Sequence, residues 1–543
     1  MLPHRIGPEG GARKEMSLAE IIARPGRTRS LKLDRPGVGW LAAYLALTLL
    51  GAAGVSVAVA AAVVEWTPAA WTALALVTLG ATWIAGGAAT ALLGVVRPEM
   101  STAAPPDDWR PRTRTAVLVL LCGEEPAPLA RYLAELRRGA DALGLGESLD
   151  IFVLSDTQDQ AGIAREQAAL APLVAAGSLT YRRRAENTGR KPGNIAEWLA
   201  TRSDGYACML VLDADSRMSA ARIRQMIHRM ESEPRLGLLQ AGMAMVPGRS
   251  LFGRHQRAAA RLLSRNFGRG LAAWSGEAGN YWGHNAIMRI AAFRSAAALP
   301  VLSGPAPFGG PPLSHDFIEA AWIRRAGWAV ALDPDTRGSA EDGPQTLAEF
   351  HKRDRRWCQG NLQHLRLIAE PGLDPVSRLH LASGIASYLA APIWLALVVL
   401  VASGAVQVEG VLPLLVVAGV LLLPKLCALA VWLARARTPA RRHTVLRASL
   451  GELALSTLVA PLVMVRQSGA VLSVLMGRDC GWKSGRAPRL HLPPGLPEAA
   501  AGLALLALAV STDPASSAAW LLPVALPLLA APLMQRWLDR GAA

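Results

Sequence analysis

The segment CMLVLDADSRM, residues 208–218, decides how the middle of this sequence is interpreted. Its first half, Cys208–Leu212, is a short apolar run typical of a buried β-strand. Two carboxylates, Asp213 and Asp215, follow at the point where such a strand ends. Asp-x-Asp at a strand end can bind a hard divalent ion through oxygen ligands. The triplet is also common in turns, and Asp215 could instead cap the next helix, so the motif alone does not establish a function.

Two further runs upstream have the same strand pattern, TAVLVLL at Thr115–Leu121 and LDIFVLS at Leu149–Ser155. Between the strands, Ala127–Leu143 and Gly162–Ala176 have the apolar spacing of helices. Strands that alternate with helices predict an α/β domain with a mostly parallel sheet, which we place at residues 97–375.

Acidic side chains follow each of the three predicted strands. Glu124 lies in the turn after the first strand, Asp156 follows the second, and Asp213 and Asp215 follow the third. Ligands bind at the carboxyl ends of strands in such sheets, so we expect these side chains to meet at one edge. Crowded carboxylates repel each other unless a cation is bound. A diphosphate would supply further oxygen ligands to that cation.

Two other segments carry residues suited to sugar-nucleotide chemistry, each with a plain structural alternative. Arg190 and Lys191 in RKPGN could bind a phosphate, or they could form a solvated basic loop near anionic lipid. Asp316 in SHD could accept a proton from an attacking hydroxyl, or it could simply stabilise the helix N-terminus.

The segment KRDRRWCQ, residues 352–359, brings Arg353, Arg356 and Trp357 within about one helical turn. The arginines could stabilise a leaving diphosphate, and the indole offers a flat face for a sugar ring. The alternative is a basic helix at the membrane surface with its tryptophan in the aromatic belt.

Long apolar blocks flank the middle domain. A bilayer core about 30 Å thick needs about 20 apolar residues per helix. Spans are predicted at about 38–64, 69–96, 379–402, 411–434, 498–510 with its flanks, and 518–533. The first apolar run is long and starts after a basic stretch, so no cleaved signal peptide is predicted. We therefore divide the chain into residues 1–37, 38–96, 97–375, 376–434, 435–495 and 496–543.

Basic residues flank the block 450–476 on both sides, and both flanks should prefer the cytoplasm. Because a full span would put one flank outside, we interpret residues 435–495 as a cytoplasmic interfacial or re-entrant segment. The count is then six spans. The N-terminus and the α/β domain are cytoplasmic.

The net charge of +16 lies largely beside the apolar blocks, which favours anionic lipid over nucleic acid as the partner. No zinc-finger or RNA-binding signature is present. The five cysteines form no CxxC pair, so neither a zinc site nor a disulfide framework is predicted.

Several longer strings are more specific than Asp-x-Asp. They are VLSD (153–156), YRRR (181–184), KPGNI (191–195), VLDADSRM (211–218), YWGHNAIMR (281–289), LSHDFIEAAWIRRAGW (313–328) and KRDRRWCQGNL (352–362). In these strings the chain resembles the glucans biosynthesis glucosyltransferase H family, which are family-2 glycosyltransferases of the GT-A fold. The resemblance is dense over about 114–400 and looser in the flanking spans.

The resemblance implies a role for each motif. Glu124 and Asp156 would contact uridine, Lys191 the diphosphate, and Asp213 the ribose and metal. Asp215 would bind Mg²⁺ or Mn²⁺. Asp316 matches the general base, and Arg356 and Trp357 match the Arg-Trp of Q-x-x-R-W. The predicted substrate contacts are completed by Trp282, Asn285 and Arg353.

The implied activity is inverting, processive transfer of glucose from UDP-glucose to a growing β-glucan at the bacterial inner membrane. The product would be the linear backbone of osmoregulated periplasmic glucans, with periplasmic glucan-maturation proteins as partners. Three departures stand out. Arg353 replaces the usual Gln, the first motif reads Cys-Gly-Glu-Glu, and the sequence ends soon after the last predicted span.

Alternative functions are a cellulose or hyaluronan synthase-like enzyme, a transferase acting once on a lipid-linked acceptor, and an inactive membrane scaffold. Arg353 and the YWGHNA and SHDF strings argue against the first. The retained acidic and Arg-Trp residues argue against the last.

Overall fold

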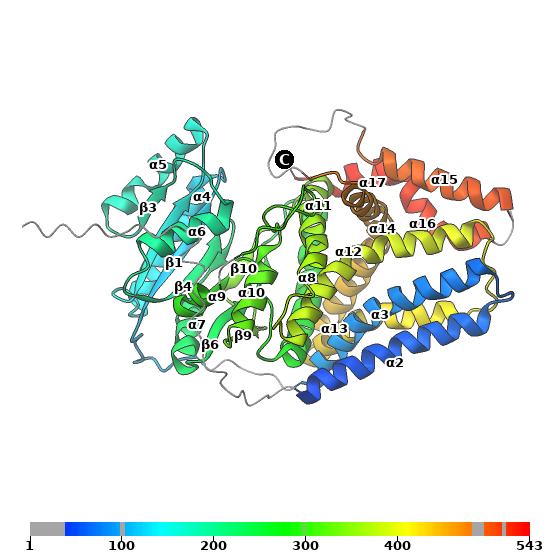
Figure 1. The fold of residues 1–543 in the computed structure, drawn as a ribbon, viewed down its shortest axis with the longest axis horizontal. Coiled ribbons are helices and arrows are strands. Elements are labelled where there is room, and N and C mark those ends of the chain that lie inside the picture. Colours follow the sequence, from blue (N-terminus) through cyan, green and yellow to red (C-terminus); the bar gives the residue numbers. More distant parts are fainter. Residues whose placement is uncertain (1–37, 98–103, 297–298, 481–492, 513–516, 543) are drawn as a thin grey trace, which may run out of the picture.

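The computed structural model describes residues 38–97, 104–296, 299–480, 493–512 and 517–542. The predicted cytoplasmic segment 1–37 lies outside the described residues, as do the basic residues Lys483, Arg486 and Arg489. Figure 1 shows an α/β domain on one side and a block of long helices on the other. The helices α8 (Leu251–Ser275) and α11 (Leu347–Gln363) lie between the two.

The α/β domain contains a seven-stranded sheet in the order β3-β2-β1-β4-β8-β6-β9. Only β8 runs antiparallel to its neighbours, so the sheet is mostly parallel, as predicted. The strands are β1 (Arg114–Leu121), β2 (Leu149–Ser155), β3 (Thr180–Arg183), β4 (Tyr206–Asp213), β6 (Leu236–Ala241), β8 (Ala286–Arg289) and β9 (Ala329–Asp333). A small second sheet has the order β5-β10-β7, formed by Arg217–Met218, Ser339–Glu341 and Ala244–Met245.

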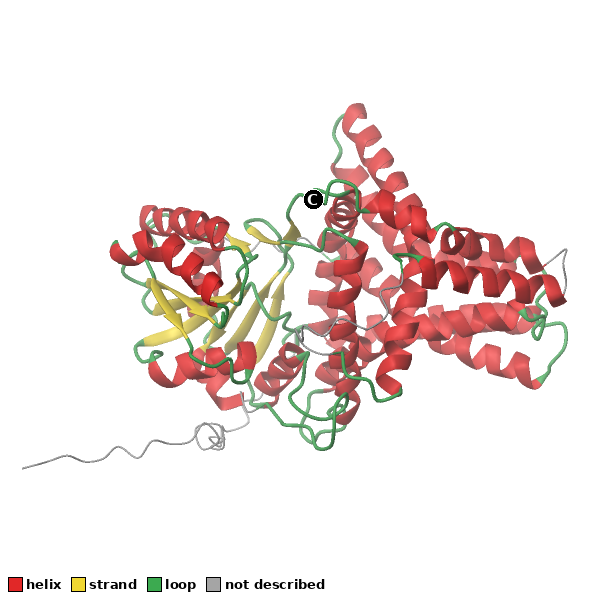
Figure 2. Cartoon of the chain, turned by 90° about the horizontal axis from the view of Figure 1, so that it is seen from above, coloured by secondary structure: helices red, strands yellow, loops and turns green. Residues whose placement is uncertain are grey.

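Helices cover both faces of the large sheet, as the strand sequences require. In β1 every residue after Arg114 is buried, because alternate side chains enter two different cores. One core contains Val117 and Val119 with α4 (Pro126–Ala142), α5 (Gln160–Ala175) and α7 (Ala220–Ser232). The other contains Leu118 with α6 (Arg190–Thr201), α9 (Ile290–Ala296) and α10 (His315–Arg325). The chain therefore folds as the predicted α/β domain, with yellow strands between red helices in Figure 2.

The remaining helices form the apolar block. They are α2 (Val38–Ala62), α3 (Pro68–Val96), α12 (Pro375–Ala402), α13 (Leu412–Arg435), α14 (Pro439–Leu475), α15 (Leu496–Thr512), α16 (Ser517–Leu529) and α17 (Ala531–Leu538). Within the described ranges, five helices are long and apolar enough to span a membrane: α2, α3, α12, α13 and α14. The last hairpin differs from the expected pair of full spans. Its α15 is a shorter apolar helix, and its second arm bends by 67° between α16 and α17.

The predicted interfacial block is one continuous helix of 37 residues, α14. Its polar residues contact other helices of the chain. Glu452 pairs with Lys425 of α13 at 2.6 Å, Arg466 with Glu498 of α15 at 3.0 Å, and Gln467 Nε2 donates to Asp354 of α11 at 3.4 Å. In Figure 1 the coil labelled α14 is seen end-on, whereas α2, α3 and α12 run across the view. The position of α14 relative to a bilayer remains a prediction.

Candidate active site

The carboxyl ends of β1, β2 and β4 are level at one edge of the sheet. In the pairing register, Leu121 lies opposite Ser155, and Leu120 lies opposite Asp213. The turns that follow these residues carry Glu124, Asp156 and the Asp213–Asp215 pair. The structure thus brings together the acidic turns that the sequence places far apart.

Asp156 is held by an arginine that the sequence analysis did not assign. The Arg184 guanidinium makes two bonds to the Asp156 carboxylate, at 2.7 and 2.9 Å, and both side chains are buried. The same guanidinium donates to the carbonyls of Thr188 and Arg190, at 2.9 and 3.0 Å. Asp156 therefore shapes the loop that leads into α6. Glu124 is exposed beside it and accepts a bond from the Cys122 amide at 2.6 Å.

Lys191 at the start of α6 forms an ion pair with Asp213 at the end of β4. The preceding Gly189 and Arg190 have φ values of +67° and +55°, a left-handed conformation that is strained for arginine. This turn directs the Lys191 ammonium across the sheet edge. Burial alone would raise the pKa of Asp213, but Lys191, His284 and Arg353 outweigh it and lower that pKa.

The Asp213–Asp215 turn suits a divalent cation. Burial and the neighbouring Asp213 carboxylate raise the pKa of Asp215, so a cation here would relieve repulsion between two anions. Within the described residues, no three His, Cys, Asp or Glu side chains are grouped as a closed metal site. The two carboxylates therefore fit a metal only if a bound diphosphate completes its oxygen ligands.

Asp316 lies at the start of α10, almost fully buried, against the loop that contains Trp282. An added Cβ at Gly283, whose φ is +90°, would come within 3.3 Å of the Asp316 Oδ2 atom. A side chain at position 283 would thus press on the carboxylate. Burial raises the pKa of Asp316, and the neighbouring His315 only partly offsets this. Trp282 is half-buried, and its amide donates to Gln240 at 2.9 Å.

Asn285 points into the protein. Its side chain is fully buried, and its backbone has a φ of +51°. Its Nδ2 donates to Ser339 Oγ at 2.9 Å. Its Oδ1 lies 3.1 Å from His284 Nδ1. These contacts give Asn285 a role in holding the loop, and the predicted substrate contact stays a prediction.

The helix α11 presents the Arg-Trp motif beside the sheet edge. Arg353 lies 3.7 Å from Glu341 of β10, and it acts electrostatically on both Asp213 and Asp215. Burial and repulsion from Arg353 lower the pKa of the half-buried Arg356. Trp357 packs partly against a core that includes Tyr388 of α12.

Besides Arg184, sequence reasoning also missed His284 and Glu341 at this site. His284 Nε2 lies 3.5 Å from Glu341, and its Nδ1 lies 3.0 Å from Ser216 Oγ in the Asp-x-Asp turn. The hydrogen bond with Glu341 and the charge of Asp213 raise the pKa of His284 against the effect of burial. His284 could have been found from the sequence, because it lies within the string YWGHNA that carries the family resemblance. Nothing local marks Glu341, which approaches only through the small sheet.

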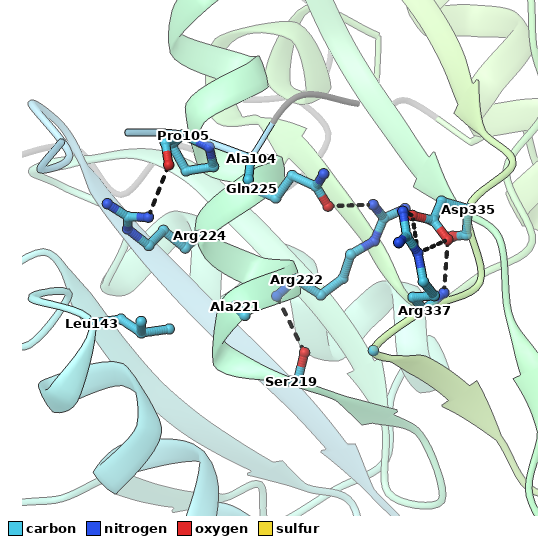
Figure 3. A pocket seen from close by; sticks show the side chains of 11 residues that line it. Ala104, Pro105, Leu143, Ser219, Ala221, Arg222, Arg224, Gln225, Asp335 and Arg337 are labelled. Atoms are coloured by element: carbon cyan, nitrogen blue, oxygen red, sulfur yellow. Dashed lines mark hydrogen bonds and ion pairs between the residues drawn. The ribbon is translucent and has the colours of Figure 1, made fainter. Parts of the chain in front are cut away.

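A separate cavity of about 430 Å³ lies at the N-terminus of α7, shown in Figure 3. Its lining includes Arg222, Arg224 and Arg337, and none of the predicted site residues.

Comparison with known proteins gives the family. Residues 117–296 match the Glycosyl transferase family 2 profile, and residues 208–434 match the Glycosyl transferase family group 2 profile. Glucans biosynthesis glucosyltransferase H of Cereibacter sphaeroides is 38% identical over 451 residues, covering 77% of this chain and 76% of that protein. The chain belongs to the glucans biosynthesis glucosyltransferase H family. The predicted resemblance is confirmed.

Other glucosyltransferase H relatives are longer. Those of Rhodopseudomonas palustris and Vibrio cholerae are each 42% identical, over 388 and 379 residues. The matches cover 66% and 64% of this chain but only 54% and 53% of those proteins. The chain thus spans about half the length of these relatives.

Among solved structures, a mannosyltransferase from Pyrobaculum calidifontis in complex with GDP-Man and Mn²⁺ is 16% identical, with a TM-score of 0.45. It covers 74% of this chain, and 97% of that structure is matched.

Proposed function

We propose that this chain is an inverting, processive glucosyltransferase that uses UDP-glucose to build a linear β-glucan at the cytoplasmic face of a bacterial inner membrane. The observation that carries the proposal is the meeting of the Asp213–Asp215 turn, Lys191 and α11 at the sheet edge. Membership of the glucosyltransferase H family supports the donor and the product.

Different residues would bind the uridine, the diphosphate and the metal of the donor complex. Glu124 and Asp156 would contact uridine, and the bond from Arg184 would hold Asp156 in place for this contact. Lys191, which pairs with Asp213 in the free enzyme, would turn to the diphosphate. Asp213 and Asp215 would hold Mg²⁺ or Mn²⁺, which neutralises the negative charge of the leaving diphosphate as a Lewis acid.

The buried Asp316 would take the proton of the acceptor hydroxyl as its oxygen attacks the anomeric carbon. A single displacement from the opposite face inverts the configuration, so no covalent enzyme intermediate is needed. Arg356 would stabilise the departing UDP in a pocket where partial desolvation strengthens the contact. Trp282 and Trp357 would provide stacking surfaces for the acceptor.

Incorporation of radiolabelled UDP-glucose by membranes, followed by linkage analysis, tests this function. We expect a β-linked glucose polymer that requires a divalent cation. A single transferred sugar would indicate a lipid-linked acceptor, and no transfer from UDP-glucose would overturn the proposal.

A further inference from the structure

One face of α11 carries both the Arg-Trp motif and the contacts that hold the start of α10. Arg353, Arg356, Gly360 and His364 follow one another by three, four and four residues, so they lie on the same face of a helix. His364 is the first residue after α11, and its backbone angles are still helical. The proposed chemistry uses Arg356 on this face but gives no role to Gly360 or His364.

Gly360 allows α11 to approach the start of α10, where Asp316 lies. A Cβ atom added at Gly360 would lie 2.2 Å from Ser314 Oγ and 2.6 Å from the Ser314 backbone nitrogen. Ser314 comes immediately before α10 and is 1% exposed. Because a backbone atom cannot rotate out of the way, any side chain at position 360 would displace the loop that carries Asp316.

His364 contacts the chain on both sides of Asp316. Its side chain is fully buried. Its Nε2 lies 3.1 Å from the Ser314 carbonyl oxygen, two residues before Asp316. Its ring also packs on Phe317, the residue after Asp316, with a distance of 5.5 Å between the ring centroids. The end of α11 therefore holds the short segment in which Asp316 lies.

The contact with Ser314 places the proton of the His364 ring on Nε2. Burial lowers the pKa of His364 to about 4, so the ring is neutral near neutral pH. A carbonyl oxygen only accepts hydrogen bonds, so Nε2 is the donor. The other nitrogen, Nδ1, is buried without a hydrogen-bond partner among the described residues. A phenyl ring would avoid this unpaired nitrogen, so the hydrogen bond to Ser314 is what histidine adds at position 364.

In-line transfer requires the base and the cation that stabilises the leaving group to lie on opposite sides of the anomeric carbon. A misplacement of about 1 Å can lower the rate on the order of 10²-fold. We propose that His364 and Gly360 are positioning residues that hold the Asp316 loop against α11, so that Asp316 and Arg356 keep one separation during glucosyl transfer. This inference rests on the proposed function for the roles of Asp316 and Arg356.

The role of His364 is tested by steady-state glucan synthesis with the full-length enzyme in detergent, together with UDP binding measured by calorimetry. His364→Phe keeps a ring but cannot donate to Ser314. We expect its kcat to fall about 10- to 100-fold, with the Kd for UDP within about twofold of wild type. His364→Gln offers an amide N–H in place of Nε2 and should recover most of the lost kcat. An equal loss of kcat and UDP binding, or no recovery in His364→Gln, would overturn the inference.

The chain offers a matched control for this substitution on α12. His380 is also buried, stacks on Trp274 with 4.9 Å between the ring centroids, and bonds the Ala278 backbone. His380→Phe should keep kcat within about twofold of wild type. A loss of kcat as large as that of His364→Phe would mean that any buried histidine matters equally, and the inference would be wrong.

Gly360→Ala tests the close approach without removing a polar group. We expect kcat to fall at least about tenfold with UDP binding retained, because the added methyl group displaces Ser314. The control is Gly469→Ala on α14, where an added Cβ atom meets nothing within 4 Å. Wild-type kcat in both Gly360→Ala and His364→Phe would overturn this inference alone. If the wild-type enzyme transferred no glucose from UDP-glucose, the proposed function would fail, and this inference would fail with it.

Discussion

Asp316 is the residue on which the proposed chemistry depends most. Its carboxylate is buried against Gly283, and we propose it as the general base. We expect Asp316→Asn to lower glucan synthesis by about 10²- to 10⁴-fold, because proton transfer contributes about that much. UDP binding should be retained, since the shape of the side chain is kept. Wild-type turnover in this variant would remove Asp316 from the base role.

The pH profile should report the same carboxylate. A base must be deprotonated, and burial raises the pKa of Asp316 above the ordinary aspartate value of 3.8. Activity is therefore complete above the raised pKa and is lost as the pH falls through it. Initial rates measured across the acid range should fall with an apparent pKa above 3.8. Enzyme stability is checked at each pH.

Asp215 should be needed for metal-dependent donor binding. The Asp215→Ala variant removes one of the two carboxylates of the turn, so a bound cation would lose a ligand and a neutralising charge. Calorimetry should show that Mg²⁺ no longer improves UDP binding. Normal Mg²⁺-dependent binding would place the metal elsewhere.

At the scale of elements, the length of α14 predicts a membrane span, whereas the contacts on either side of it indicate another position. It is long enough to span a bilayer, but the segments that precede and follow it both contact helices that lie between the α/β domain and the apolar block. Before it, Trp432 Nε1 donates to the Leu262 carbonyl of α8 at 3.1 Å, and after it Asp479 bonds Gln359 of α11. Because both flanking segments lie on the side of the apolar block that faces the α/β domain, these contacts favour the predicted in-plane placement of α14.

Reporter fusions can test this placement of α14. We expect fusions after Arg437 and after Arg478 both to report the cytoplasm, with a fusion after Glu65 reporting the periplasm as the control. A periplasmic signal after Arg478 alone would make α14 a membrane span.

At the scale of the whole molecule, we expect the stability of the α/β domain to depend on an ion pair that joins α7 to β9. Arg222 and Asp333 are 3.0 Å apart, and each side chain is only 2% exposed. Figure 3 shows Arg222 extending toward the Asp335–Arg337 turn beside the cavity. Arg222→Met would leave the Asp333 carboxylate buried without this partner, at a cost of about 3–5 kcal/mol.

The expected result is a melting temperature lower by about 6–15 °C in a thermal scan of the purified protein. Arg337→Met is the control, because the Arg337 side chain is 78% exposed and its pair with Asp335 should contribute little. Similar melting temperatures for the Arg222→Met variant and wild type would show that Arg222 is not needed for stability.

Much of the fold could be predicted because the strands carry their own signal. The apolar run before Asp213 and the two runs upstream became β4, β1 and β2 with ends within two residues of those expected. The length and polarity of α14 did not predict where it packs, because Glu452, Arg466 and Gln467 pair with residues of neighbouring helices that are distant in sequence.

The sequence by itself determined the α/β class, the apolar block and the acidic turns, because strand period, span length and carboxylates at strand ends are local properties. Only the tertiary structure decided that Arg184 holds Asp156, that Glu341 reaches His284, and that Asp479 returns to α11. These contacts join residues far apart in the chain, so their geometry depends on how the sheet and helices pack and not on any local pattern.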